Sequence, residues 1–140
     1  MKKIKLFLNP ILYYMEDSSG FASPHYINFQ NGEIVSPDFD DGISHEDVKD
    51  EERYLRIEPI TSHEGYGIMQ DFAVAEDSDE IRALLFDALE RKKPFHNFKN
   101  AIAEYPDTQK KFYAYKDRRL KEIFRDQLAE RGYEVAEETF

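Results

Sequence analysis

The sequence predicts an α+β fold: a small antiparallel sheet, made of an N-terminal hairpin and a third strand, packed against a C-terminal array of about four helices. Strand-like segments come mainly before residue 61, and segments with helical spacing of apolar residues follow. Strands that precede helices, rather than alternating with them, are typical of this class. The 140 residues fit a single core, so we expect one domain spanning residues 1–140.

The first element expected is a short helix. Asn9-Pro10 reads as an N-cap followed by proline at the first helical position, which predicts a helix from Pro10 to about Asp17. Basic residues before an apolar run also resemble a secretory signal, but Lys5, Asn9 and Pro10 interrupt that run. We therefore expect neither a signal peptide nor a membrane span, and a cytoplasmic protein.

A β-hairpin and a third strand come next. HYINFQNGEIVSP, residues 25–37, alternates around Asn31-Gly32, the pair that favours a type I′ turn. The acidic residues 38–52 indicate a surface loop or an irregular short helix. YLRIEPI, residues 54–60, predicts a third strand that Pro59 ends or places at an edge.

Four helices are expected after residue 60. Thr61 with Glu64, and Asp77 with Glu80, have the spacing of a capping box. The clearest amphipathic pattern follows the second box and consists of Ile81, Leu84, Leu85, Ala88 and Leu89.

The last two helices are expected to meet at a proline. Pro94 opens one helix, Pro106 ends it, and Asp107 caps a long helix that runs to Gly132. Residues 133–136 favour a short final strand. One face of the helix from Pro94 collects Phe95, Phe98, Ile102 and Tyr105, and the first three are expected to pack against Leu85 and Leu89.

Three motifs carry a resemblance to a known family. The chain contains an M-x-D-F motif, an F-x-x-F-K motif, and a Tyr-Pro pair before an aromatic and basic helix. With these motifs it resembles the bacterial uncharacterised protein family (UPF) number 0158, to which no activity is assigned. It departs from the family pattern at Lys93-Pro94, Phe112 and Gln127, which affects packing more than fold. The motif residues are Met69, Asp71, Phe72, Phe95, Phe98, Lys99, Tyr105 and Pro106.

Charge is distributed unevenly along the chain. The net charge is −10, with −13 over residues 1–90, +7 over residues 91–125 and −4 over residues 126–140. An acidic protein disfavours general binding of polyanions, whereas a basic segment confined to consecutive helices can form one positive face.

Six basic residues are the candidate partner-binding residues. On the helix from Asp107, the predicted apolar side holds Tyr113, Leu120 and Phe124. Lys111, Arg118 and Arg125 lie on nearly the opposite side. They form either a solvated face or a contact for a phosphate-bearing or acidic partner. The candidates are Lys92, Lys93, Lys99, Lys111, Arg118 and Arg125.

No motif assigns a reaction, a metal or a cofactor. The absence of cysteine excludes disulfides, thiolate metal sites and a cysteine nucleophile. DFDDG, residues 38–42, has the wrong spacing for a calcium loop, and no two histidines share a helical face. Asp71 is expected to accept a structural hydrogen bond from the following helix or from Lys99, with acid–base catalysis as the alternative.

These observations favour a non-enzymatic protein-interaction or regulatory domain with no catalytic residue, no metal and no cofactor. An unknown protein is the expected partner. The first alternative is association with nucleic acid through the basic helices of residues 91–125, which requires a continuous positive face. The second is an enzyme whose site is assembled from dispersed residues, which requires a pocket with converging polar groups.

Overall fold

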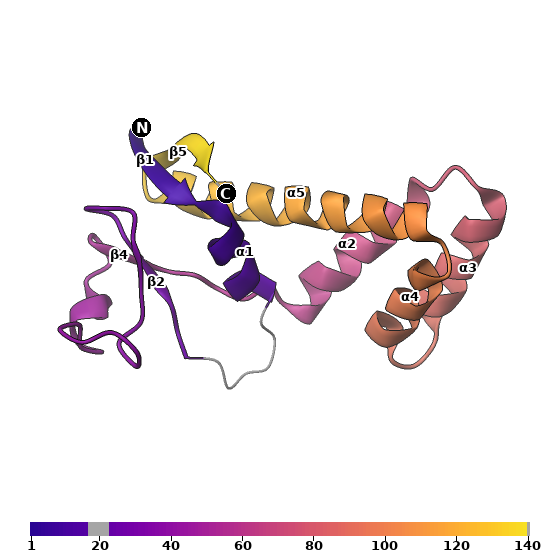
Figure 1. Ribbon diagram of the computed structural model, residues 1–140, viewed down its shortest axis with the longest axis horizontal. Helices are drawn as coiled ribbons and strands as arrows, with labels where there is room; N and C mark the ends of the chain where they lie inside the picture. The colour runs from indigo at the N-terminus through magenta and orange to yellow at the C-terminus, as the bar shows by residue number, and fades with distance from the viewer. Residues whose placement is uncertain (17–22, 140) are drawn as a thin grey trace. The chain divides into compact units, whose positions relative to one another are not determined.

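The computed structural model describes residues 1–16 and 23–139. It confirms the α+β class, with a three-stranded antiparallel sheet, a parallel pair of strands and five α-helices among the described residues (Figure 1). In chain order the elements are β1 (Lys2–Phe7), α1 (Leu8–Glu16), β2 (Tyr26–Asn28), β3 (Ile34–Val35), the 3-10 helix η1 (Asp47–Lys49), β4 (Tyr54–Arg56), α2 (Ser62–Val74), α3 (Asp79–Glu90), α4 (Pro94–Ala103), α5 (Pro106–Glu130) and β5 (Tyr133–Thr139).

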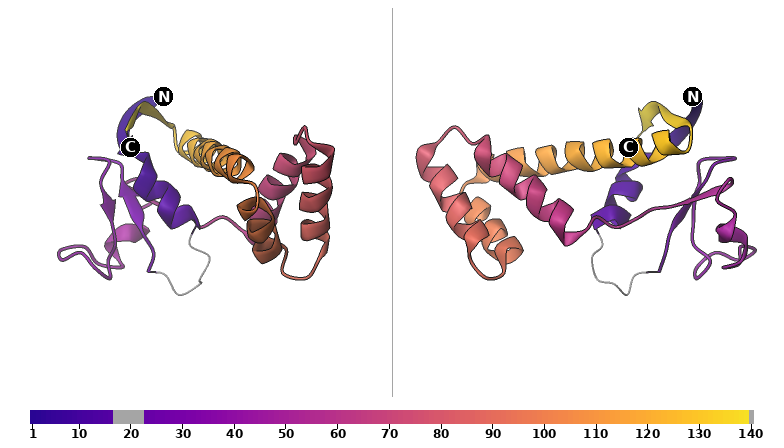
Figure 2. Two further views of the ribbon diagram at one scale, coloured as in Figure 1. Left: turned by 45° about the vertical axis from the view of Figure 1, so that its right-hand side comes forward. Right: turned by 180° about the vertical axis from the view of Figure 1, so that it is seen from behind.

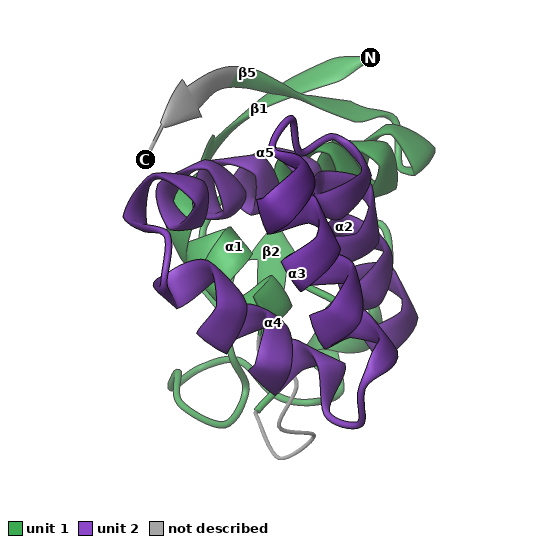
Figure 3. Cartoon of the chain, turned by 90° about the vertical axis from the view of Figure 1, so that its right-hand side faces the viewer, with its two compact units in different colours: residues 1–60, 120–140 green, residues 61–119 purple. Residues whose placement is uncertain are grey.

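The chain forms two compact units, coloured separately in Figure 3. The sheet unit comprises residues 1–60 and 120–140, and the helical unit comprises residues 61–119. Helix α5 contributes its first part to the helical unit and its last part to the sheet unit. That the chain folds as one domain stays a prediction.

The antiparallel sheet of the sheet unit has β2 at its centre. Ile27 of β2 faces Ile34 of β3 on one side and Leu55 of β4 on the other, so the predicted hairpin and third strand are both present. The predicted type I′ turn is wrong. Gly32 has a φ of 74°, but among the described residues Lys93 is the only non-glycine residue with a positive φ, so Asn31 does not adopt the required conformation.

The hairpin loop departs from the predicted turn because an asparagine side chain bends the chain early. The Oδ1 atom of Asn28 accepts a hydrogen bond from the backbone N–H of Gln30. The Asn28 carbonyl oxygen then accepts from the N–H groups of Asn31 and Gly32. The loop consequently spans five residues, 29–33, instead of two.

A second sheet joins distant parts of the chain. β1, which the sequence interpretation missed, pairs in parallel with β5, and Lys2 is opposite Tyr133. Buried Ile4 and Leu6 alternate with exposed Lys3 and Lys5, the period of a strand with one face in the core. The predicted final strand is confirmed and extends to Thr139.

Helix α1 positions the aromatic residues that matter below. It begins at Leu8, so the predicted N-cap at Asn9 is wrong, and the predicted end at Asp17 lies outside the described residues. Its inward face repeats at helical spacing, which leaves Tyr13 on the opposite face and 70% exposed. The buried residues are Leu8, Ile11, Leu12 and Met15.

Three aromatic rings form the core of the helical unit. Phe112 of α5 packs edge-on against Phe72 of α2 and Phe98 of α4, with ring centroids 5.2 Å and 4.9 Å apart. Phe98 is fully buried, as are Ile102 and Leu85, and α3 and α4 lie side by side (Figure 2). Such edge-to-face pairs add stability beyond the area that they bury.

Two predicted core rings are solvent-exposed instead. Phe95 is 41% exposed because Pro94, four residues before Phe98, occupies the inward position in the first turn of α4. Tyr113 is 39% exposed because α5 buries Phe112 in the helical unit. The two parts of α5 have different neighbours, so a single apolar stripe does not extend along the helix.

The helix caps are partly as predicted. Thr61 and Glu64 form the predicted capping box of α2. The predicted box at Asp77 is wrong, because Ser78 is the N-cap of α3 and accepts from the N–H of Ile81. Pro106 is the first residue of α5, which puts Asp107 inside its first turn rather than at its cap.

Candidate functional site

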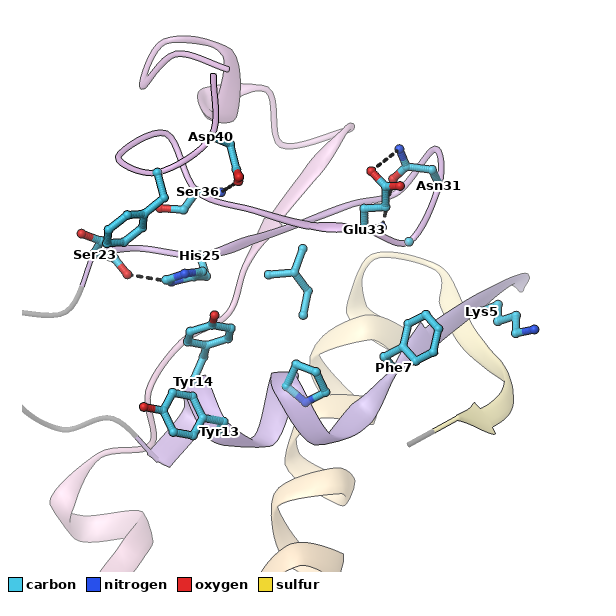
Figure 4. Close-up of a pocket in the computed structure, with 14 residues that line it drawn as sticks. Lys5, Phe7, Tyr13, Tyr14, Ser23, His25, Asn31, Glu33, Ser36 and Asp40 are labelled. Carbon is cyan, nitrogen blue, oxygen red and sulfur yellow. Dashed lines mark hydrogen bonds between the residues drawn. The ribbon is translucent and has the colours of Figure 1, made fainter. Parts of the chain in front are cut away.

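The sheet unit contains an open groove. It has a volume of about 1100 Å³ and lies between the β1–α1 segment and the hairpin of β2 and β3 (Figure 4). We call it the aromatic groove because five rings line it. Its lining includes Phe7, Tyr13, Tyr14, His25 and Phe39.

Three local structures present four of these rings, and Phe7, the last residue of β1, is the fifth. Tyr13 and Tyr14 lie in the last turn of α1, on the side opposite its buried residues. His25 directly precedes β2, and its Nδ1 atom donates to the Ser23 carbonyl oxygen at 2.8 Å. Phe39 lies in a turn that a carboxylate holds, because the Oδ2 atom of Asp40 accepts from the backbone N–H of Ser36 at 2.6 Å.

The rings form a connected series. Tyr14 stacks on His25 with centroids 3.7 Å apart, and His25 lies 6.1 Å from Phe39. Tyr13 stands nearly perpendicular to Tyr14, at 80° with centroids 5.4 Å apart. The outer rings remain open to solvent, since Tyr13 is 70% and Phe39 is 72% exposed. A flat or cationic group can therefore lie against them.

Polar groups in the groove can orient a bound chain. Ser36 lines the groove, and its hydroxyl is buried without a hydrogen-bond partner among the described residues. Buried hydroxyls are normally satisfied, so this oxygen is an exception in the wall of the groove. The carboxylates of Glu33 and Asp40 also line the groove. The hydrogen bond of His25 Nδ1 to a carbonyl oxygen fixes the orientation of the imidazole and leaves Nε2 as the second ring nitrogen.

The helical unit contains a separate polar cluster around Asp71. The Nη1 atom of Arg119 donates to the Asp71 carboxylate at 2.9 Å and to the Tyr115 hydroxyl at 2.5 Å. The predicted partners of Asp71, Lys99 or the following helix, are therefore wrong. The hydrogen bond to Asp71 raises the pKa of Arg119 above its ordinary value, so this guanidinium stays protonated at any physiological pH.

The six predicted partner-binding residues are all exposed. Lys111 and Arg118 line one depression of about 440 Å³, beside Tyr115 and the acidic Glu76 and Asp77. Lys92 and Lys93 lie between α3 and α4, Lys99 lies on α4, and Arg125 lies on the part of α5 that belongs to the sheet unit. That these residues bind a partner stays a prediction.

Carboxylates of the acidic loop bind groups that are close to them in the sequence. Asp40 caps the turn described above, the Nε2 atom of His45 lies 2.8 Å from Oδ1 of Asp38, and Asp47 accepts from the N–H of Ser44. Over residues 1–16 and 23–139, no group of three metal-ligating side chains comes together. Within the same ranges, no helix combines the length and apolarity needed to cross a membrane.

The sequence interpretation missed the aromatic groove. One signal was present, because Ile11, Leu12 and Met15 define the inward face of a helix and leave two adjacent tyrosines outside it. His25 and Phe39 gave no such signal. They meet the tyrosines only through long-range packing of the hairpin.

Comparison with known proteins gives a family and a relative. Residues 6–139 match the family described as "Uncharacterised protein family (UPF0158)". The "UPF0158 protein PA5073" of Pseudomonas aeruginosa is 30% identical over 119 residues, which is 80% of this chain and 75% of the relative. No solved structure matches the chain. Neither name states a reaction or a ligand.

Proposed function

The chain belongs to the uncharacterised protein family UPF0158, and since that description assigns no activity, we propose from the geometry that it is a non-enzymatic protein-interaction domain. The resemblance based on the M-x-D-F and F-x-x-F-K motifs is confirmed by this membership. The partner-binding surface is the aromatic groove, and its occupant is a short segment of another protein.

One observation carries the proposal: three large exposed rings gather on one concave surface. Phe7, Tyr13 and Phe39 are 55%, 70% and 72% exposed, and all three line the aromatic groove. Soluble proteins rarely leave apolar side chains clustered in contact with water, and aromatic residues are enriched at protein interfaces. The volume of about 1100 Å³ suits a peptide segment better than a small metabolite.

The groove also offers polar groups to a bound peptide. The carboxylates of Glu33 and Asp40 line it and can accept hydrogen bonds from N–H groups. Ile34 and Pro10 also line the groove and supply apolar contact area. An apolar floor with a few placed polar groups supports binding of a segment that contains both apolar and polar side chains.

The test is a selection of displayed short linear peptides against the full chain, followed by binding measurements on the enriched sequences. The Tyr13→Ser/Phe39→Ser variant should lose at least about tenfold in affinity, because buried aromatic anchors dominate such interfaces. The matched control is Val74→Ser/Tyr113→Ser, which removes two exposed apolar side chains of the helical unit. It should bind like the parent.

Two outcomes would contradict the proposal. One is the absence of any enriched peptide. The other is binding that the groove variant and the control variant reduce equally. Equal melting temperatures of parent and variants establish that any loss of affinity is local.

A further inference from the structure

We infer that the segment bound in the aromatic groove is cationic, with an arginine or lysine side chain lying against the rings at the α1 end. This inference rests on the proposed function, because it specifies the occupant of the same groove. Four features of the sheet unit support a cation at that place.

The first feature is the ring geometry. Tyr14 stacks with one face on His25, whereas Tyr13, which stands at 80° to Tyr14 with centroids 5.4 Å apart, is 70% exposed. A cation over the face of an aromatic ring is attracted by the ring quadrupole, so the exposed Tyr13 ring suits an ammonium or guanidinium group. The sheet unit already uses this contact internally, since the Arg53 guanidinium lies 5.3 Å from the centroid of the Tyr54 ring.

The second feature is the end of helix α1. Tyr13 and Tyr14 lie in its last turn, where the backbone carbonyl groups give the helix a partial negative charge. That turn contains no basic residue and ends at Glu16. A cationic side chain from outside therefore finds a favourable potential there.

The third feature is the charge of the lining. Glu33 and Asp40 contribute two carboxylates, and Asp40 is adjacent to Phe39 in the chain. Lys5 is the basic residue of the lining and lies at the end of the groove opposite Tyr13 (Figure 4). A bound segment with its cation at the tyrosine end avoids repulsion by Lys5.

The fourth feature is the charge of the unit as a whole. The sheet unit contains 9 Lys and Arg against 18 Asp and Glu, a formal charge of −9, whereas the helical unit contains 10 against 11, a charge of −1. A surface in a field of this sign attracts cations and repels phosphates. The exposed rings of the groove thus lie in the more acidic unit, which disfavours the stacking of nucleic-acid bases on them.

The test uses synthetic, fluorescently labelled copies of the enriched peptides and variants of them with citrulline in place of each arginine and norleucine in place of each lysine. Citrulline keeps the shape of arginine and removes its charge. One such replacement should weaken binding to the full chain about tenfold. Added salt should weaken the binding of the parent peptide and leave the binding of its neutral form unchanged.

A matched pair of protein variants separates local from general charge effects. Glu33→Gln/Asp40→Asn removes two carboxylates of the groove, while the new amide oxygen at position 40 can still accept from Ser36. Glu51→Gln/Glu52→Gln removes two exposed carboxylates of the same unit that do not line the groove. The first variant should bind the cationic peptide several-fold more weakly than the second.

The outcomes distinguish this inference from the proposed function. Enriched peptides that depend on Tyr13 and Phe39 but carry no essential cation would overturn the cationic occupant and leave the interaction domain standing. Absence of groove-dependent peptides would overturn both. A labelled oligothymidylate that competes for the groove at physiological salt would replace the peptide with a single-stranded nucleic acid.

Discussion

At the scale of single residues, Gly32 satisfies two requirements at once. Its φ of 74° lies in the left-handed region, where a side chain is strained. A Cβ atom at this position would lie 2.3 Å from the backbone carbonyl oxygen of Lys5 in β1. The hairpin that forms one wall of the aromatic groove therefore approaches β1 as closely as it does only because residue 32 lacks a side chain.

Gly32→Ala should lower the free energy of unfolding by about 2–4 kcal/mol, combining backbone strain with the displacement of β1. Gly42→Ala is the matched control, because Gly42 has a φ of 84° and no atom within 4 Å of its added Cβ. The control should cost only the strain, about 1–2 kcal/mol. Urea denaturation of both variants measures the difference. Equal losses of unfolding free energy in the two variants would show that the close approach of residue 32 to the Lys5 carbonyl oxygen has no energetic consequence.

At the scale of elements, the pair of phenylalanines on α4 shows how helical phase determines burial. Phe98 is fully buried against Phe112, whereas Phe95, three residues earlier, is 41% exposed. Helical spacing alone places both on one face. The structure separates them, since the half-buried Pro94 takes the inward position of the first turn.

Phe98→Ala should destabilise the chain by about 3–5 kcal/mol through the cavity that it leaves. Phe95→Ala, the same substitution one turn earlier, should cost less than about 1 kcal/mol because little area is removed from the core. Thermal and urea unfolding of the two variants provide the comparison. A Phe95→Ala variant as unstable as Phe98→Ala would mean that the exposed ring packs against something in solution.

The elements that the sequence predicted are those with strong local signals. The capping box at Thr61 and Glu64, the proline at the start of α4 and the glycine after α5 are formed by residues a few positions apart. β1 was missed because its alternation is short and its partner, β5, lies at the other end of the chain. The hydrogen-bond partner predicted for Asp71 was wrong for the same reason, because Arg119 lies on a helix far along the sequence.

The aromatic groove was less predictable from the sequence than β1 or the partner of Asp71. Its rings come from β1, from α1, from the residue before β2 and from the turn after β3, and no local periodicity relates these segments. The basic residues drew attention instead because they cluster in the sequence. In the structure Lys111 and Arg118 line one depression, together with Glu76 and Asp77.

At the scale of the whole molecule, the net charge of −10 sets what the surface can bind. Duplex DNA and RNA are attracted mainly through their phosphates, and binding by the exposed Lys111 and Arg118 has to overcome repulsion by the acidic remainder. The basic residues of 91–125 include some on the sheet unit, whose formal charge is −9.

We therefore expect no saturable binding of labelled DNA or RNA at physiological salt. Any binding at low salt should weaken with salt at a slope of about −0.9 per phosphate contact, and the Lys111→Glu/Arg118→Glu variant should abolish it. Electrophoretic and anisotropy titrations at two salt concentrations measure this. Salt-resistant binding by the parent that the charge reversals remove would favour the nucleic-acid alternative over the protein partner.

The pairing of β1 with β5 has a consequence for the order in which the chain acquires its structure during synthesis. Helices α2 to α4 and the first part of α5, which make up the helical unit, come from the continuous residues 61–119, whereas the sheet unit needs both residues 1–60 and residues 120–140. On a translating ribosome, β1 emerges early and stays without its parallel partner until Tyr133–Thr139 have also left the exit tunnel. Contacts of such high sequence separation form slowly, so the helical unit is complete while the sheet unit still presents an unpaired strand edge to chaperones.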